Sequence, residues 1–241
     1  MIERDSILLG LDDTDMLHQG GTGRLSRELA RLLVDETGAA LLGVSRHPLL
    51  QDPRVPCTRK NQASCIALRL RDEAIGPIAA WLREEVRRRA VPGSDPGICV
   101  ATRRQVTPAI VGWGERVKRD LVRQAEALAL AAREGLILEP LGGTGDGVIG
   151  ALAAVGLRAA GNDGRLTMLG RIRELDGVQT VSALLAAGPI ARVCDRAGTP
   201  LPPEATVETA GKVRPWLQEG EPVLMVEPAG DGTWRPVHRG S

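Results

Sequence analysis

Tyrosine and phenylalanine are absent from the 241 residues, and four tryptophans are the whole aromatic content. Proteins that hold single-stranded nucleic acids stack the bases on exposed aromatic rings, so a stacking platform is disfavoured here. The formal net charge is +1, which argues against a strongly basic nucleic-acid-binding protein. It does not exclude a local basic patch.

Cysteine pairs and long apolar runs are missing too. Cys57, Cys65, Cys99 and Cys194 show no Cys-x-x-Cys spacing, which disfavours a disulfide framework or a zinc ribbon and favours reduced, ordinary thiols in the cytoplasm. No segment is typical of a signal peptide or a membrane span, so no membrane partner is expected. The hydrophobic content of 43% and the charged content of 25% are typical of a soluble globular protein.

Three carboxylates follow a short apolar strand that we predict at residues 6–11. Asp12, Asp13 and Asp15 lie within four positions, and like charges this close repel one another unless a cation lies among them. Carboxylate and water oxygens are the ligands that Mg²⁺ prefers. We therefore predict that the three aspartates are metal ligands and catalytic residues; the alternative is a polar loop with solvated acids.

A glycine turn follows the acids and opens an amphipathic helix predicted at residues 24–35. Free N–H groups at a helix start favour an anion, so the turn around Thr22 is a candidate phosphate site beside the metal. The tetrapeptide Gly-Gly-Thr-Gly recurs at residues 142–145, again ahead of a helix, with chance recurrence as the alternative. The predicted phosphate-binding residues of the two turns are Gly20, Gly21 and Gly23, and Gly142, Gly143, Thr144, Gly145 and Gly147.

The periodicity predicts an α/β protein of the α+β kind. Strands at 6–11, 41–45, 63–70 and 97–101 and helices at 24–35 and 72–89 give the order βαββαβ, a ferredoxin-like unit at about 1–102. One long helix at 115–134 and a glycine-containing helix after residue 147 extend it, so that residues 1–170 form one domain. Residues 171–241 are predicted as a small β appendage of antiparallel strands, at 190–194, 205–208, 222–226 and 233–236.

Four segments in the same order resemble the archaeal tRNA(Ile) 2-agmatinylcytidine synthetase family, over roughly the first 170 residues. The segments are Gly10-Leu-Asp-Asp-Thr-Asp15, Pro56-Cys-Thr-Arg-Lys-Asn-Gln-Ala63, Asp95-Pro-Gly97 and Gly145-Asp-Gly-Val-Ile-Gly-Ala-Leu-Ala-Ala-Val-Gly156. The first and the last are long and specific. The resemblance implies a kinase-like domain that binds ATP and Mg²⁺ and phosphorylates a cytidine oxygen before agmatine displaces the phosphate.

The resemblance also implies roles for individual residues. Asp12, Asp13 and Asp15 match the family's acidic motif, and Thr22 falls on the threonine that the family autophosphorylates. Thr58, Arg59 and Asn61 match the family's Thr-Arg-x-Asn run and are predicted to contact the nucleotide. The family's C-terminal OB-fold and zinc ribbon have no counterpart in the last part of this chain.

The basic residues Arg59 and Lys60 and the two histidines each have a functional and a structural interpretation. Arg59 can hold a phosphate with two parallel hydrogen bonds and Lys60 adds a point charge, or both belong to an exposed basic loop. His18 and His47 lie in loops predicted to face the site, as a general base or as surface histidines.

We therefore expect the loop after residue 11, the loop at 58–61 and the turn at 142–147 to converge on one cleft. The favoured function is an ATP- and Mg²⁺-dependent enzyme of the kinase or ligase type that activates a substrate oxygen, with a small-molecule acceptor or amine as substrate. One alternative is tRNA modification with a separate RNA-binding partner. The other is a nucleotide-binding module without turnover.

Overall fold

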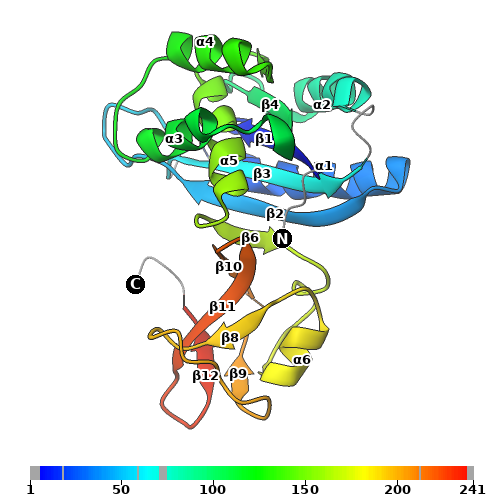
Figure 1. Cartoon of the computed structure of the whole chain (residues 1–241), viewed down its shortest axis with the longest axis vertical. Helices are drawn as coiled ribbons and strands as arrows, with labels where there is room; N and C mark the ends of the chain where they lie inside the picture. Colours follow the sequence, from blue (N-terminus) through cyan, green and yellow to red (C-terminus); the bar gives the residue numbers. More distant parts are fainter. Residues whose placement is uncertain (1–5, 18, 59, 71–74, 212, 238–241) are drawn as a thin grey trace.

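The computed structural model describes residues 6–17, 19–58, 60–70, 75–211 and 213–237 as a mixed α/β fold (Figure 1). The first half contains β1 (Ser6–Asp12), α1 (Thr22–Thr37), β2 (Ala40–Pro48), β3 (Gln62–Arg69), α2 (Ile75–Arg89), β4 (Gly97–Thr102), the short helix η2 (Arg103–Gln105), α3 (Pro108–Val117), α4 (Gln124–Glu134) and β5 (Ile137–Pro140). The second half contains α5 (Gly147–Ala160), β6 (Arg165–Met168), β7 (Val178–Thr180), α6 (Val181–Ala186), β8 (Arg192–Cys194), β9 (Thr206–Glu208), β10 (Trp216–Gln218), β11 (Glu221–Pro228) and β12 (Trp234–Pro236).

The strands form an open and mostly antiparallel sheet. Its order is β5-β4-β1-β3-β2-β6-β10-β11-β12-β9-β7, and β8 pairs with β11. In the N-terminal part β1 lies between β3 and β4 and is antiparallel to both, while β2 is the hairpin partner of β3. The predicted order of strands and helices in the first hundred residues is thus observed.

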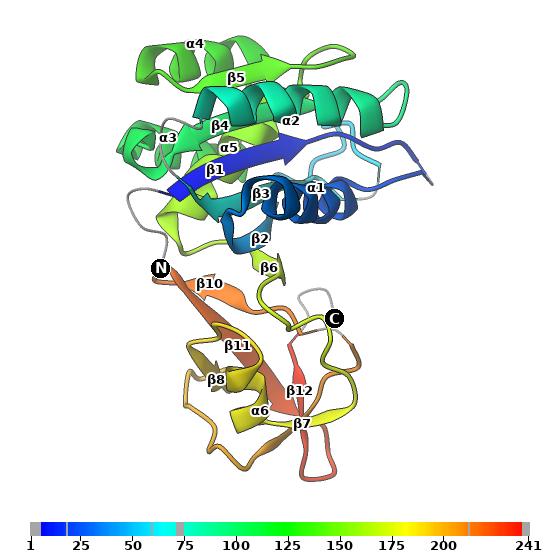
Figure 2. The ribbon, with the colours of Figure 1, turned by 90° about the vertical axis from the view of Figure 1, so that its right-hand side faces the viewer.

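The alternation of side chains along β1 explains why this strand reads as a continuous apolar run. Ile7, Leu9 and Leu11 belong to the core that α1 and α2 cover. Leu8 belongs to the core on the opposite face, which α3, α4 and α5 cover. In Figure 2 α1 and α2 lie in front of the sheet, and α5 lies behind it. By the same alternation Gly10 and Asp12 are directed toward α5.

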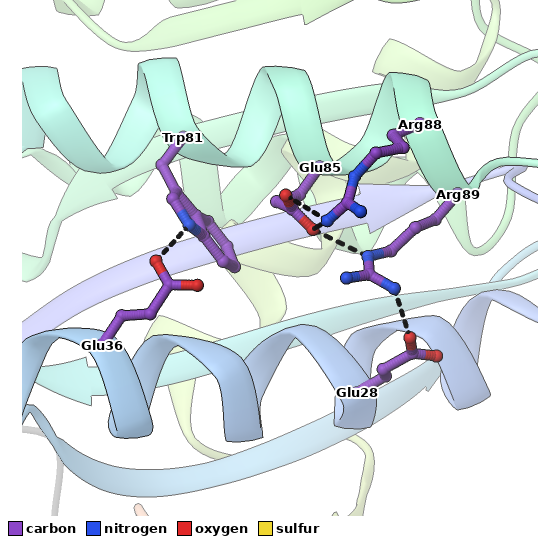
Figure 3. A network of polar contacts seen from close by, with 6 residues as sticks. All are labelled: Glu28, Glu36, Trp81, Glu85, Arg88 and Arg89. Carbon is purple, nitrogen blue, oxygen red and sulfur yellow. Dashed lines mark hydrogen bonds and ion pairs between the residues drawn. The ribbon is translucent and has the colours of Figure 1, made fainter.

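The two helices of the outer layer are joined by polar side chains (Figure 3). The indole Nε1 of Trp81 donates to Glu36 at 2.7 Å, which ties α2 to the end of α1. Arg89 bonds Glu28 of α1 at 2.6 Å and Glu85 of its own helix at 2.7 Å. These partly exposed pairs each contribute only a few tenths of a kcal/mol, so the apolar faces beneath them hold the layer.

Small residues bring α5 into direct contact with the backbone of the sheet. A Cβ on Gly10 of β1 would lie 2.0 Å from the carbonyl oxygen of Ala151, and one on Gly97 of β4 would lie 2.2 Å from the carbonyl carbon of Gly147. On the far side of α5, a Cβ on Gly156 would lie 2.3 Å from the carbonyl oxygen of Ile110 in α3. Glycine is therefore required wherever α5 touches a neighbouring main chain.

The prediction of one long helix at 115–134 is wrong. The structure has α3 at Pro108–Val117 and α4 at Gln124–Glu134, separated by an irregular segment. Pro108 occupies the first turn of α3, where a missing N–H costs nothing. Gly114, near the end of α3, allows this helix to approach the Ala153 carbonyl of α5.

The C-terminal strands surround a hydrophobic cluster of their own, which includes Leu166, Leu184, Val207 and Leu224. The predicted strands are present, but the expectation that all are antiparallel is wrong: β8 with β11, and β9 with β12, are parallel pairs. The sequence also missed β10, which joins β6 to β11. A domain boundary near residue 170 stays a prediction.

None of the helices within the described ranges has the length and apolar character needed to cross a lipid bilayer.

The backbone contact at Gly10 generates a stability prediction. Gly10→Ala should lower the free energy of unfolding by at least about 1–3 kcal/mol, because the new methyl group overlaps a main-chain oxygen that cannot move without shifting α5. Gly112→Ala is the matched control, since a Cβ there meets no atom within 4 Å and should stabilise α3 by roughly 0.5–1 kcal/mol. Urea unfolding of the three proteins measures both effects; an unchanged midpoint for Gly10→Ala would contradict the close packing.

Candidate functional site

A cavity of about 480 Å³ opens where β1 ends. The loop after β1, the loop before β3 and the turn before α5 all contribute to its wall, so the three predicted stretches converge although they are far apart in sequence. The segment between α3 and α4 closes another side with Asp120, Leu121 and Val122. The predicted site residues on its wall are Asp12, Asp13, Asp15, Thr22, Thr58, Asn61, Gly143, Thr144 and Gly147.

Asp12 is the last residue of β1 and lies against the first turn of α5. A Cβ on Gly150 would be 1.8 Å from Asp12 Oδ2, so the carboxylate occupies the space that the glycine leaves. Burial, followed by the charge of Asp13, raises the pKa of Asp12 to about 7. The folded protein thus holds a carboxylate here in surroundings that disfavour its ionised form.

Asp13 lies beside Asp12 in a left-handed backbone conformation with φ of 50°, which aspartate tolerates better than most residues. Burial raises the pKa of Asp13 to about 6, and the charges of Asp95, Asp15 and Asp146 add to this effect. The cavity therefore gathers several carboxylates that raise one another's pKa, although Lys60 and Arg54 also lie on its wall. A bound cation would relieve the repulsion.

Asp15 holds two segments together with one carboxylate. Its Oδ1 accepts hydrogen bonds from the backbone N–H and the hydroxyl of Thr22, at 3.1 and 2.9 Å, and its Oδ2 accepts from the Thr58 hydroxyl at 3.1 Å. The backbone N–H and the hydroxyl of Thr14 both donate to Thr22 Oγ1 at 3.2 Å. Part of the predicted anion site at the start of α1 is thus filled by an acid of the protein itself.

Asp95 does the same for the second glycine turn. Its carboxylate accepts from the Thr144 hydroxyl and from the backbone N–H groups of Gly145 and Asp146, the latter two at 2.7 and 3.2 Å. Asp95 and Asp146 both line the cavity and were not predicted as site residues. The available signal was the Asp95-Pro-Gly97 motif, which marks the residue that fastens the turn.

The remaining predicted phosphate residues are dispersed. Gly20 and Gly21 line a second, smaller hollow of about 270 Å³. Gly23, Gly142 and Gly145 are not among the residues that line either space. Lys60 lies on the wall of the larger cavity, as does Asn61, whose side-chain amide donates to the Leu50 carbonyl at 3.0 Å. Arg59 and His18 lie outside the described residues.

The prediction that His47 faces the site is wrong, as is its alternative of a surface histidine. Residues 46–48 continue β2, and the imidazole is fully buried on the same face as Ser45. Ser45 Oγ lies 2.8 Å from Nε2, and Asp163 Oδ1 lies 2.9 Å from Nδ1. Burial lowers the pKa of His47, against which Asp163 acts, and the imidazole links β2 to the turn after α5.

The four cysteines differ in their exposure. Cys65, Cys99 and Cys194 are buried, Cys57 is exposed, and all four are free.

No group of three histidine, cysteine or acidic side chains converges as a ready ligand set within the described part of the chain. Mg²⁺ does not require such a set, because it keeps several waters and usually takes one or two carboxylates together with substrate phosphates. Asp12 and Asp13 fit this requirement, since both line the cavity and both have their pKa raised by burial and neighbouring charge. The cavity volume is also within the range of small-molecule sites.

The chain is thus an α/β protein with an open sheet and a cavity at the end of β1 that is lined by carboxylates and glycine turns. Its fold is similar to that of TiaS, a tRNA(Ile2) agmatidine synthetase. No protein-family model matches the chain, and no curated protein matches it.

The similarity covers the larger part of this chain and a minor part of its relatives. A complex of TiaS with tRNA(Ile2) and ATP matches with a TM-score of 0.53 and 26% identity, over 63% of this chain and 36% of that chain. A tRNA fluorescent labelling enzyme matches with a TM-score of 0.54 and 26% identity over the same shares. A complex of TiaS with tRNA(Ile2), AMPCPP and agmatine matches with a TM-score of 0.53 and 24% identity, over 62% and 36%. The matched region thus spans about a third of the length of these enzymes.

Because the pKa of Asp12 is raised, removal of its charge should increase the free energy of unfolding by an amount that depends on pH. The folded-state pKa of about 7 exceeds the ordinary value of about 3.9, so the folded chain binds more protons than the unfolded chain between these values, and stability falls as the pH rises through this range. Asp12→Asn should therefore be more stable than the wild type at pH 8, on the order of 2 kcal/mol after allowance for solvent screening, and the gain should shrink toward pH 4.

Urea unfolding in EDTA at several pH values tests this expectation. Asp120→Asn is the control, because Asp120 lines the same cavity on an exposed segment. A difference between Asp12→Asn and wild type that does not change with pH would contradict the electrostatic account.

Proposed function

We propose that the chain is an ATP- and Mg²⁺-dependent phosphoryl-transfer enzyme, related to TiaS, that activates an acceptor oxygen by phosphorylation. The observation that carries this proposal is the division among the carboxylates of the cavity. Asp15 and Asp95 are engaged by hydroxyl and N–H donors, whereas Asp12 and Asp13 face the cavity with raised pKa values. Phosphoryl transfer depends on such positioned charge more than on covalent chemistry.

We infer a ferredoxin-like unit in the N-terminal part. The order β1-α1-β2-β3-α2-β4, with β4-β1-β3-β2 across the sheet and antiparallel neighbours, supports this assignment. In this proposal residues 1–170 are an ATP-binding, kinase-like domain and residues 171–241 are a small β-rich region.

Mg²⁺ is assigned to Asp12 and Asp13, and when bound it would neutralise charge on the phosphates of ATP. Asp15 was predicted as a third ligand, but both of its oxygens already accept hydrogen bonds. We propose instead that Asp15 supports the site by positioning Thr22 and Thr58. Lys60, Asn61, Gly143, Thr144 and Gly147 line the same cavity and are proposed to contact the nucleotide, with Arg59 added on the family resemblance alone.

Thr22 is proposed as the phosphoacceptor that the resemblance implies. Its hydroxyl lines the cavity and donates to Asp15 Oδ1 at 2.9 Å. In such a step the bond from Thr22 Oγ1 to the γ-phosphorus forms, the bond from that phosphorus to the bridging oxygen of ADP breaks, and Asp15 accepts the hydroxyl proton.

A small-molecule acceptor or amine is the favoured substrate, since the net charge is +1 and the chain contains no Phe or Tyr. The second candidate is tRNA modification with a separate RNA-binding partner. It is favoured by the similarity to the TiaS complex with tRNA(Ile2) and ATP. A nucleotide-binding module without turnover is the third possibility, and a turnover assay separates it from the other two.

The proposal predicts that ATP binds only together with metal. Mg²⁺ alone should raise the melting temperature by relieving repulsion between the acids, and ATP should raise it further only when Mg²⁺ is present. Asp13→Asn should weaken the Mg²⁺ and ATP responses more than it harms the fold, while the exposed Asp35→Asn should leave them unchanged. Equal stabilisation by ATP in EDTA and in Mg²⁺ would rule out the metal role.

Turnover is measured on the same samples, as ATP consumption with agmatine, with total tRNA and with neither. Faster consumption with the amine supports the favoured function. Stimulation by tRNA at physiological salt that is lost in Asp12→Asn supports tRNA modification instead. If ATP binds but is consumed under none of the three conditions, the enzymatic proposal is contradicted.

Gly150 provides a second test of the same site. In Gly150→Ala the new methyl group would overlap Asp12 Oδ2, and the flexible carboxylate must turn away because the helix backbone cannot. We expect the Mg²⁺ and ATP responses to fall at least tenfold in apparent affinity, with a loss of unfolding free energy below about 2 kcal/mol. Calorimetric titration and urea unfolding measure the two effects, with Gly112→Ala as the control. A variant that binds ATP and Mg²⁺ normally would contradict the role of Asp12.

A further inference from the structure

Five arginines from separate segments gather beside the start of α1. This arginine cluster consists of Arg27 and Arg31 of α1, Arg46 of β2, Arg173 in the turn after β6, and Arg214 just before β10. Figure 2 shows α1 and β2 above β6 and β10, which is the junction where the cluster forms. None of its members lines the cavity that contains Asp12.

The backbone of Gly23 and the pairing of three strands bring these side chains together. A Cβ on Gly23 would lie 3.7 Å from Arg27 Nη1 and 4.0 Å from Arg46 Cδ, so the two side chains meet over the first turn of α1. Arg46 is the sheet partner of Arg165, which in turn is the partner of Trp216. Arg214 is two residues before Trp216 and so reaches the same region from the C-terminal strands.

Within the described ranges no ion pair joins an acidic side chain to any of the five arginines. Arg27 donates to the Gly23 carbonyl at 2.6 Å, and Arg173 donates to the Thr167 carbonyl at 3.1 Å. These hydrogen bonds position the guanidinium groups but do not neutralise their positive charge. Arginines elsewhere, such as Arg83 and Arg116, are paired with glutamates.

The charges of the cluster act on one another. Partial burial, and then the charges of the other four arginines, lower the pKa of Arg27 to about 10. Burial and the charge of Arg214 also lower the pKa of Arg46, against which Asp15 acts with the opposite sign. Such a cluster costs folding free energy unless an anion binds to it.

We propose that the arginine cluster binds a phosphate group of the acceptor substrate, next to the cavity that takes ATP. The assignment of this phosphate to the acceptor rests on the proposed function. The phosphate site itself rests only on the contacts and charges of the five arginines. Gly23, where Arg27 and Arg46 meet, directly follows Thr22 on the cavity wall. A molecule held at the cluster would therefore present its other end to the cavity.

The chemistry of the cluster favours phosphate over a single carboxylate. Guanidinium groups match phosphate oxygens with two parallel hydrogen bonds, and a dianion offsets more of the five charges than a monoanion does. The two sources of such a group are a free phosphorylated small molecule and the backbone of an RNA strand.

Inorganic phosphate is the first probe, titrated in low salt and followed by the melting temperature. Arg27→Gln/Arg46→Gln should bind phosphate at least about tenfold more weakly than the wild type, since charged hydrogen bonds are lost at two positions. Arg119→Gln is the matched control, because Arg119 is exposed on another face and donates only to the Glu115 carbonyl among its hydrogen bonds. The single variant Arg214→Gln repeats the test on a residue outside α1 and β2, in case the double variant does not fold. Equal phosphate affinity in the cluster variants and the wild type overturns the proposal.

The ATP and Mg²⁺ response of each variant separates this inference from the proposed function. A normal ATP response together with a lost phosphate response supports a second, independent anion site. An ATP response that is missing from the wild type contradicts the proposed function, and the phosphate titration still tests the cluster.

A nucleoside 5′-monophosphate and a single-stranded RNA of about ten nucleotides identify the source of the phosphate. Monophosphate binding that is weakened in Arg27→Gln/Arg46→Gln supports a small phosphorylated acceptor. RNA binding that falls steeply with salt and is weakened in the same variant assigns the phosphate to an RNA strand. If neither probe binds, or neither is affected by the substitutions, the proposal is wrong.

Discussion

The direct contact between the main chain of α5 and the main chains of β1 and β4 determines most of the other features. Gly10 and Gly97 in the strands, with Gly147 and Gly150 in the helix, remove the side chains that would hold the two layers apart. Because α5 packs directly against the backbone of the sheet, its first turn contacts the end of β1 at Asp12. The same approach also buries nearly every residue of α5.

Within the site the acids fall into two groups that physical chemistry separates clearly. Asp15 and Asp95 accept hydrogen bonds from three donors each and hold loops in place. Burial raises the pKa values of Asp12 and Asp13, and neighbouring carboxylates add to this effect: Asp13 acts on Asp12, and Asp95 acts on Asp13. Carboxylates that look equivalent in the sequence thus differ in how their charge is compensated. Only at Asp12 and Asp13 would a bound cation relieve an uncompensated negative charge.

Much of the N-terminal fold could be predicted, because hydrophobic period and glycine position are local signals. The strand before Asp12, the helix after Thr22 and the glycine-rich helix at Gly147 all follow from such patterns. The split between α3 and α4 could not, since the glycines near Gly114 signal a break locally but serve a contact with α5 that is distant in sequence. His47 was misjudged for a similar reason: its partner Asp163 lies 116 positions away. The arginine cluster depends on strand pairing between segments that nothing in the local sequence connects.

The C-terminal strands are joined to the N-terminal sheet through β6, which is four residues long. On one side β6 pairs with the nine-residue strand β2, and on the other Arg165 of β6 pairs with Trp216 of β10. β6 thus covers the hydrogen-bonding edge of a long strand that would otherwise be open to pairing with another molecule. A form of the protein that ended after α5 would keep both large hydrophobic clusters of the N-terminal part and yet expose that edge. Such a form would tend to associate with other copies of itself along β2.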